Sequence, residues 1–118
     1  MEEKMSKKYE MFRMTWKEIE EAVKEDPVVI IPLGSTEQQG PHTPTGDYRA
    51  ATAVAKEVAK ETKSLTIPTI AFGYSEYFRN FPGTISLSAE TLLSVLLETV
   101  RSLRSSGFKH IIFFNGHG

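Results

Sequence analysis

Hydrophobic residues follow two alternating patterns along this sequence. The run at 28–33 is continuously apolar and β-branched, which is typical of a strand covered on both faces, and further strands are expected at 65–71 and 110–114. Between these runs, apolar residues recur at helical spacing over 47–61 and 88–106. Strand, helix, strand, helix, strand in this order predicts an α/β fold, a parallel sheet with helices on both faces.

Capping residues mark the expected helix ends. Thr15 and Glu18 have the spacing of a capping box, which predicts a short helix that runs to Lys24. Ser88 is placed to cap the long helix near the carboxyl end, and Gly107 stands at the position where a left-handed residue closes it. The pattern therefore predicts one additional helix ahead of the first strand.

The domain organisation is simple. We expect residues 1–13 to form a charged, flexible amino-terminal tail and residues 14–118 to form one α/β domain. Pro68 lacks a backbone donor, so its strand should carry it at an end, a bulge or an edge. Three strands are few for a parallel sheet, so the fold looks truncated, and we expect another chain or a longer protein to supply the missing layer.

Composition narrows the function. The 14 basic and 15 acidic side chains give a net charge of −1, which argues against a nucleic-acid partner. There is no cysteine, so any metal site must use oxygen and nitrogen ligands. No segment has the apolar length of a signal peptide or of a membrane helix, so we expect no membrane partner and a cytoplasmic location.

The segment 34–47 is too polar and too rich in glycine and proline for an ordinary connector. It follows the first strand and supplies Glu37 and Asp47, whereas His117 follows the third strand. If those strands are neighbours, the three side chains converge in one crevice at the carboxyl ends of the strands. Two carboxylates and an imidazole suit Zn²⁺, Mn²⁺ or Fe²⁺, which polarises a carbonyl and acidifies water, as in metallohydrolases.

Plainer roles compete at each of these positions. Glu37 could cap the loop or form an ion pair, and Asp47 stands where an N-cap residue belongs. His42, between two prolines, could be a ligand, an outer-shell donor or a residue that stiffens the loop. His110 opens the third strand and is expected at the surface or the sheet edge.

Several short motifs occur in a fixed order from residue 14 onward. They are MTW at 14–16, PLGSTEQ at 32–38, GPH at 40–42, GYS at 73–75, FPGTISL at 81–87, and GF at 107–108 leading to NGHG at 115–118. With these motifs the chain resembles the amino-terminal portion of the creatininase (creatinine amidohydrolase) family.

The resemblance implies a creatininase-like fold, a Rossmann-like arrangement of three layers. It implies two divalent ions, Zn or Mn, with Glu37 as a carboxylate ligand, Asp47 as the bridging ligand and His117 as the imidazole ligand. The implied reaction is hydrolysis of a non-peptide C–N bond in a cyclic or formyl amide by a metal-activated water. The partners it implies are a small-molecule amide substrate and further copies of the chain, as a hexamer.

The chain departs from the family pattern in three ways. Family members normally carry a metal-binding histidine two positions after the glutamate; Gln39 stands there in this chain, which makes the second ion doubtful. Asp47 comes one position early, and family chains continue well beyond Gly118. We therefore expect the isolated chain to lack full catalysis. The alternative is a non-catalytic α/β assembly module that pairs with another chain.

Overall fold

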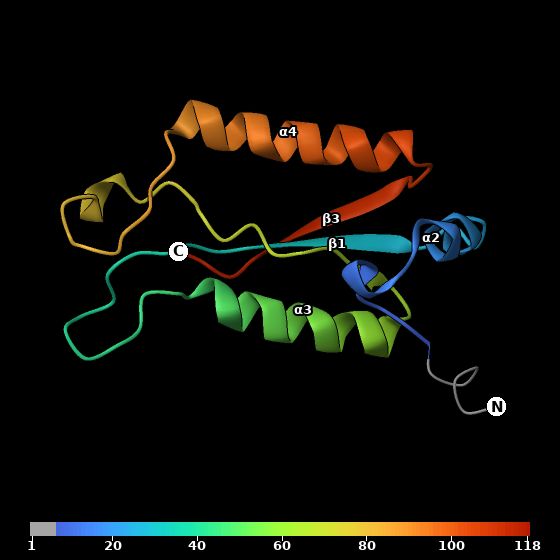
Figure 1. The fold of residues 1–118 in the computed structure, drawn as a ribbon, viewed down its shortest axis with the longest axis horizontal. Helices are drawn as coiled ribbons and strands as arrows, with labels where there is room; N and C mark the ends of the chain where they lie inside the picture. The colour runs from blue at the N-terminus through green and yellow to red at the C-terminus, as the bar shows by residue number, and fades with distance from the viewer. Residues whose placement is uncertain (1–6) are drawn as a thin grey trace.

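The computed structural model describes residues 7–118 and has the predicted order of strands and helices (Figure 1). Its elements are the 3₁₀ turn η1 (Met11–Arg13), α2 (Trp16–Val23), β1 (Val28–Leu33), α3 (Tyr48–Thr62), β2 (Leu65–Thr66), the 3₁₀ turn η2 (Glu76–Phe78), α4 (Ala89–Ser105) and β3 (His110–Asn115).

The three strands form one parallel sheet in the order β2-β1-β3. β1 is the central strand and pairs with β3 along its whole length, from Val28 opposite His110 to Leu33 opposite Asn115. Its pairing with β2 is limited to Val29 with Leu65 and Ile30 with Thr66. The continuously apolar run is thus the strand with a neighbour on each side, as a run without polar alternation predicts.

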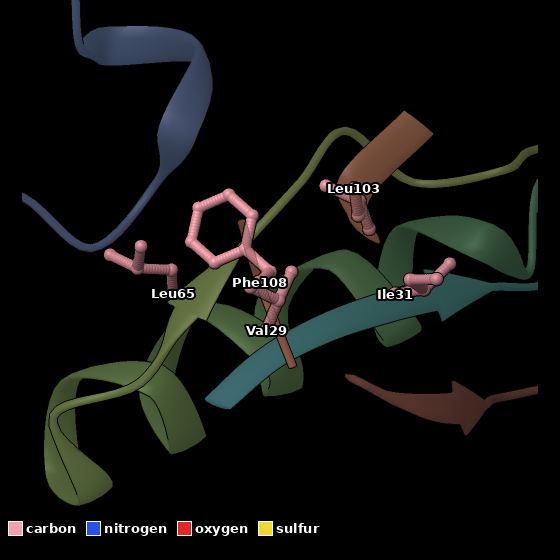
Figure 2. Packing of buried hydrophobic residues seen from close by; sticks show 5 residues of the cluster. All are labelled: Val29, Ile31, Leu65, Leu103 and Phe108. Carbon is pink, nitrogen blue, oxygen red and sulfur yellow. The ribbon is translucent and has the colours of Figure 1, made fainter. Parts of the chain in front are cut away.

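Helices α3 and α4 lie on opposite sides of the sheet, which confirms the predicted class of fold (Figure 1). On one face, Val29 and Ile31 pack with Leu65, Leu103 and Phe108 (Figure 2). The opposite face presents Ile30, which packs against the small residues Ala55 and Ala59 of α3. Small residues on α3 bring the helix close to β1, and this close packing positions the loop that precedes the helix.

The predicted helix ends are confirmed. The backbone N–H of Glu18 donates to Thr15 Oγ1 at 3.1 Å, and the backbone N–H of Thr15 donates to Glu18 Oε1 at 2.8 Å, completing the capping box. Ser88 Oγ accepts from the backbone N–H of Thr91 at 3.1 Å. Gly107 has a φ of +106°, the left-handed conformation that closes a helix with little strain in glycine.

The second strand is shorter than the expected 65–71. β2 ends at Thr66, and the pairing resumes only as an isolated bridge between Ile70 and Leu33. Pro68 lies in this gap, and because it has no N–H to donate, it interrupts the pairing. The expected places for Pro68 were an end, a bulge or an edge of its strand; it lies just beyond the end of β2, which is also an outer strand of the sheet.

The amino-terminal segment differs from the expected flexible tail where the structure describes it. Residues 1–6 lie outside the described residues. Beyond them, Tyr9 O accepts from the backbone N–H of Thr66 at 2.8 Å, and Glu10 is buried. Met11 packs against the core. Residues 9–11 therefore lie against β2 as part of the domain.

One side of the molecule is apolar and exposed. Within residues 7–118, β3 has a strand neighbour only at the edge that pairs with β1. Phe113 of β3 is exposed on the side of the sheet that α4 covers, and Leu93 and Leu97 of α4 are exposed too; we call these three residues the β3–α4 face. Ile112 is exposed on the opposite side of the sheet. No helix in the described chain is long and apolar enough to cross a membrane.

Candidate metal centre

The candidate site lies at the carboxyl ends of β1 and β3. These ends are level, since Leu33 pairs with Asn115 and the backbone N–H of Gly116 donates to Leu33 O at 2.9 Å. The loops that follow the two strands therefore start side by side. The convergence of Glu37, Asp47 and His117 was predicted on the condition that the first and third strands are neighbours, and the pairing of β1 with β3 meets this condition.

The three predicted side chains do meet. His117 Nδ1 lies 2.7 Å from Asp47 Oδ2, and His117 Nε2 lies 3.7 Å from Glu37 Oε1. Side-chain exposure is 8% for Glu37, 23% for Asp47 and 26% for His117. Glu37 is therefore nearly buried, whereas Asp47 and His117 are partly accessible to solvent. The imidazole stands between the two carboxylates and has one ring nitrogen near each.

Asp47 is held by Ser35. The backbone N–H of Ser35 donates to Asp47 Oδ1 at 2.6 Å, and Ser35 Oγ donates to Asp47 Oδ2 at 2.9 Å. Asp47 does occupy the N-cap position of α3, but its side chain accepts no hydrogen bond from the helix amides. The capping role considered for Asp47 is therefore wrong, because its carboxylate faces β1 and His117 instead.

The hydrogen bonds assign the proton of the imidazole. An ionised carboxylate only accepts, so the short contact to Asp47 Oδ2 places a hydrogen on His117 Nδ1. In the neutral ring, His117 Nε2 then carries the lone pair and faces Glu37. A carboxylate behind a histidine in this way fixes the ring and raises its basicity as a ligand.

Sequence reasoning missed Ser35. Its position directly after Gly34, in the first turn beyond β1, was the available signal, but many loop serines occupy such positions without a role. The structure distinguishes it, because Ser35 is completely buried and its Oγ lies 3.1 Å from His117 Nδ1 as well as 2.9 Å from Asp47 Oδ2.

Glu37 is set in place by its backbone. Its N–H donates to Thr45 O at 3.0 Å, and the adjacent N–H of Gln38 donates to Thr84 Oγ1 at 3.1 Å. Thr36 also accepts from the N–H of Ile85 at 2.9 Å. The loop after β1 is therefore tied to the aromatic-rich loop at 72–86, which carries the exposed rings of Tyr74, Tyr77 and Phe81.

The donor set fits a divalent ion in chemical type, although the arrangement is not that of a ready three-ligand site. Two ligands at about 2.1 Å from a tetrahedral ion lie about 3.4 Å apart, close to the separation of Glu37 Oε1 and His117 Nε2. Asp47, however, is hydrogen-bonded to the imidazole, and no three His, Cys, Asp or Glu side chains of residues 7–118 stand ready to hold an ion. Coordination by all three residues requires the bond from His117 to Asp47 to be exchanged for a bond to the ion.

The other candidate residues lie apart from this cluster. His42 is exposed on the loop, and Gln39 is half-buried two residues beyond Glu37. His110 is a surface residue, as expected, and its Nε2 lies 3.0 Å from Asp26 Oδ2. A cleft of about 610 Å³ lies at the opposite ends of the strands, beside Pro27 and Leu65 at the starts of β1 and β2, and is remote from the candidate ligands.

The comparisons with known proteins agree with the fold and the motifs. The family model for creatinine amidohydrolase matches residues 13–118. Among curated relatives, a 3-dehydro-scyllo-inosose hydrolase of Thermotoga maritima is 37% identical over 89% of this chain and 34% of its own length. A mycofactocin precursor peptide peptidase of Mycobacterium ulcerans is 44% identical over 78% of this chain and 40% of its own length.

Solved structures give the same answer. A manganese creatininase superposes with a TM-score of 0.89 at 34% identity, and a mutant creatininase of the Zn-Zn type superposes with a TM-score of 0.86 at 33% identity. Each match covers 94% of this chain and 46% of the other chain, so this chain spans less than half the length of the proteins it resembles. The chain belongs to the creatininase family and corresponds to the amino-terminal portion of its members.

Proposed function

We propose that this chain carries the metal-binding part of an amidohydrolase that cleaves a C–N bond. The observation that carries the proposal is the convergence of Glu37, Asp47 and His117 from the ends of two adjacent strands. These residues would hold Zn²⁺ or Mn²⁺, the ions in the descriptions of the two solved creatininases. Since the chain spans less than half of those proteins, the activity of the whole protein is part of the proposal.

A divalent ion at this position supplies Lewis acidity, which polarises an amide carbonyl and acidifies water. The chain's own residues prepare the position. In the metal-free site, Asp47 binds His117 Nδ1, which leaves Nε2 of the neutral ring as the nitrogen with the lone pair. Asp47 itself would become a ligand once this hydrogen bond is exchanged for a bond to the ion. Glu37 contributes a nearly buried negative charge that balances part of the ion's charge. The exposed rings of Tyr74 and Tyr77 would form a wall for the substrate.

The proposed substrate is a small amide, cyclic or formyl in type, as the family resemblance implies. The matched relatives include a peptidase, and the matching family model is that of creatinine amidohydrolase. Both names denote hydrolysis of an amide C–N bond, which supports the reaction type. Within this reaction type, we propose a non-peptide amide rather than a peptide as the substrate.

The test is elemental analysis of the purified protein after exhaustive dialysis. We expect about one zinc or manganese ion per chain, or two if the site retains a second position despite Gln39. Glu37→Gln and Asp47→Asn should each lower the bound metal severalfold, because each removes a charged oxygen ligand. Asp26→Asn is the matched control, since it alters a carboxylate paired with an imidazole at the surface.

A metal content near zero in the parent protein would contradict the proposal, as would full metal content in both Glu37→Gln and Asp47→Asn. Amide hydrolysis is then assayed on the metal-loaded protein. Activity that is lost in the two site variants and kept in Asp26→Asn would support the reaction type.

A second candidate function rests on the β3–α4 face. An open strand edge flanked by exposed apolar side chains favours association. We propose as the alternative a non-catalytic assembly module that pairs with another chain. When no other protein is present, the partner is a second copy of this chain. The family resemblance implies a hexamer of such copies. Assembly that persists in Asp47→Asn while no metal binds would favour this alternative.

A cytoplasmic location stays a prediction.

A further inference from the structure

Ser35 contacts two of the three candidate ligands, Asp47 and His117. It is completely buried, and its backbone N–H and hydroxyl bind the two oxygens of Asp47 separately, at 2.6 and 2.9 Å. A carboxylate gripped at both oxygens by one residue cannot rotate about its terminal bond without losing at least one of these hydrogen bonds. The orientation of Asp47 is therefore set from β1.

The same hydroxyl also constrains His117. Ser35 Oγ lies 3.1 Å from His117 Nδ1, and Asp47 Oδ2 lies 2.7 Å from it. Because the hydroxyl hydrogen goes to Asp47, the oxygen lone pairs remain free to face the Nδ1–H of the ring. Serine, carboxylate and imidazole form a closed triangle in which each member restrains the other two.

The serine side chain has little freedom of its own. It lies directly after Gly34, where β1 ends, and a side chain on Gly73 in the neighbouring loop would come within 4.0 Å of Ser35 Cβ. Burial between these two backbones holds Oγ at the triangle. A restrained hydroxyl loses less entropy when it forms these bonds than an exposed one does.

From this triangle we propose that Ser35 is a positioning residue, which orients the Asp47 carboxylate and holds the His117 ring with its Nε2 toward Glu37. This inference rests on the proposed function as far as metal binding is concerned. Partners of this kind behind a metal ligand typically change metal affinity by about 10- to 100-fold when they are removed.

Ser75 provides a matched control. It is also a buried serine, but its Oγ has no hydrogen-bond partner among the described residues. Ser75→Ala therefore deletes a buried hydroxyl without deleting a bond, whereas Ser35→Ala deletes the hydroxyl that contacts Asp47 and His117. Ser35→Thr keeps the hydroxyl and serves as the conservative variant.

The experiment compares the parent, Ser35→Ala, Ser35→Thr and Ser75→Ala in two measurements. The first is nitrogen-15 NMR of the histidine side chains in metal-free protein, at an alkaline pH where the imidazole is neutral. The second is calorimetric titration with Zn²⁺. Thermal unfolding shows which variants are folded under the conditions used.

We expect His117 to be the Nδ1–H tautomer in the parent and in Ser75→Ala, and a mixture of tautomers in Ser35→Ala. Zinc affinity should fall about 10- to 100-fold in Ser35→Ala, stay unchanged in Ser75→Ala and be largely restored in Ser35→Thr. This combination separates positioning from a general effect of losing a buried hydroxyl.

The inference is overturned if His117 is the Nε2–H tautomer in the parent, a result that needs no variant to fold. It is also overturned if Ser35→Ala matches Ser75→Ala in both measurements. If the parent binds no zinc, the proposed function fails, and the tautomers of the metal-free proteins alone decide the role of Ser35.

Discussion

Gly34 shows how closely the candidate site is built against the backbone. A Cβ at this position would lie 2.6 Å from the Cα of Tyr48 and 2.9 Å from Asp47 Oδ1. Contacts this short are not found for real side chains, and the first is to main chain, which moves only with the start of α3. The missing side chain at Gly34 is therefore what allows Asp47 to reach Ser35.

Gly34→Ala should push α3 and Asp47 away from β1. We expect a loss of roughly 1–3 kcal/mol in the free energy of unfolding, as for other overpacked positions. Chemical denaturation measures this loss. Gly118→Ala is the control, since a Cβ there meets nothing within 4 Å. Equal stability of the two variants would show that the site tolerates a side chain at Gly34.

At this scale the sequence predicts residue types better than their contacts. Polar residues beyond the carboxyl ends of strands indicated Glu37, Asp47 and His117, and the structure brings them together. The capping role considered for Asp47 failed, because a good N-cap residue is also a good acceptor for Ser35 and His117. Ser35 was missed because burial and hydrogen bonding, rather than its residue type, distinguish it.

Helix α2 depends on a charged capping residue. The backbone N–H of Thr15 and then the ammonium group of Lys8 bind the Glu18 carboxylate, and they hold the pKa of Glu18 below its ordinary 4.5. A folded-state pKa below the unfolded value means that the ionised carboxylate stabilises the folded state. This contribution is complete above the unfolded pKa and is lost as the pH falls through the folded one.

Glu18→Gln should remove this part of the pH dependence. We expect the variant to be less stable than the parent at neutral pH and the difference to shrink as the pH falls below about 4.5, the ordinary pKa of a glutamate side chain. Thermal unfolding from pH 7 to pH 3 measures it. Glu20→Gln, on the exposed side of the same helix, is the control. A difference that stays constant across this range would contradict the capping argument.

Whole elements were predictable where one signal dominated. The apolar run of β1 and the capped periodic pattern of α4 gave the correct types and nearly the correct ends. β2 came out shorter because the pairing lapses around Pro68, a local effect that an apolar run does not reveal. The packing of Tyr9 and Glu10 against β2 depends on tertiary contacts that a charged amino-terminal composition conceals.

The whole molecule combines a well-covered strand with a poorly covered one. β1 is buried on both faces, whereas Ile112 and Phe113 of β3 are about half exposed. The long helix α4 buries Leu103 near its carboxyl end and leaves Leu93 and Leu97 exposed. The β3–α4 face therefore offers both an open strand edge and an apolar surface to a second copy.

We expect the chain alone to self-associate at micromolar concentration through this face. Leu93→Glu should weaken the association roughly tenfold or more, because a buried leucine contributes about 1.5–3 kcal/mol. Sedimentation velocity over a concentration series measures it. Val54→Glu places the same charge on an exposed apolar position of α3 and is the control. A clean monomer of the parent protein at micromolar concentration would contradict the expectation.

The parallel order of strands and helices, and hence the class of fold, followed from the alternating patterns. The neighbour relations did not, since a sequence of three strands is compatible with more than one order in the sheet. In the observed order, β1 lies between β2 and β3. The loops that carry Glu37 and His117 therefore follow the carboxyl ends of two neighbouring strands, which brings the two side chains together. That order depends on which helix covers which face, and so on packing across the whole chain.

The central place of β1 also has a consequence for how the chain folds. β1 is synthesised before β2 and β3, yet its longer pairing is with β3. Val28 can pair only after His110 has been synthesised. Closing so long a loop costs more entropy than closing the one to β2, so the full pairing comes late. On the ribosome, this strongly apolar strand is therefore only partly covered until residues 110–115 have emerged.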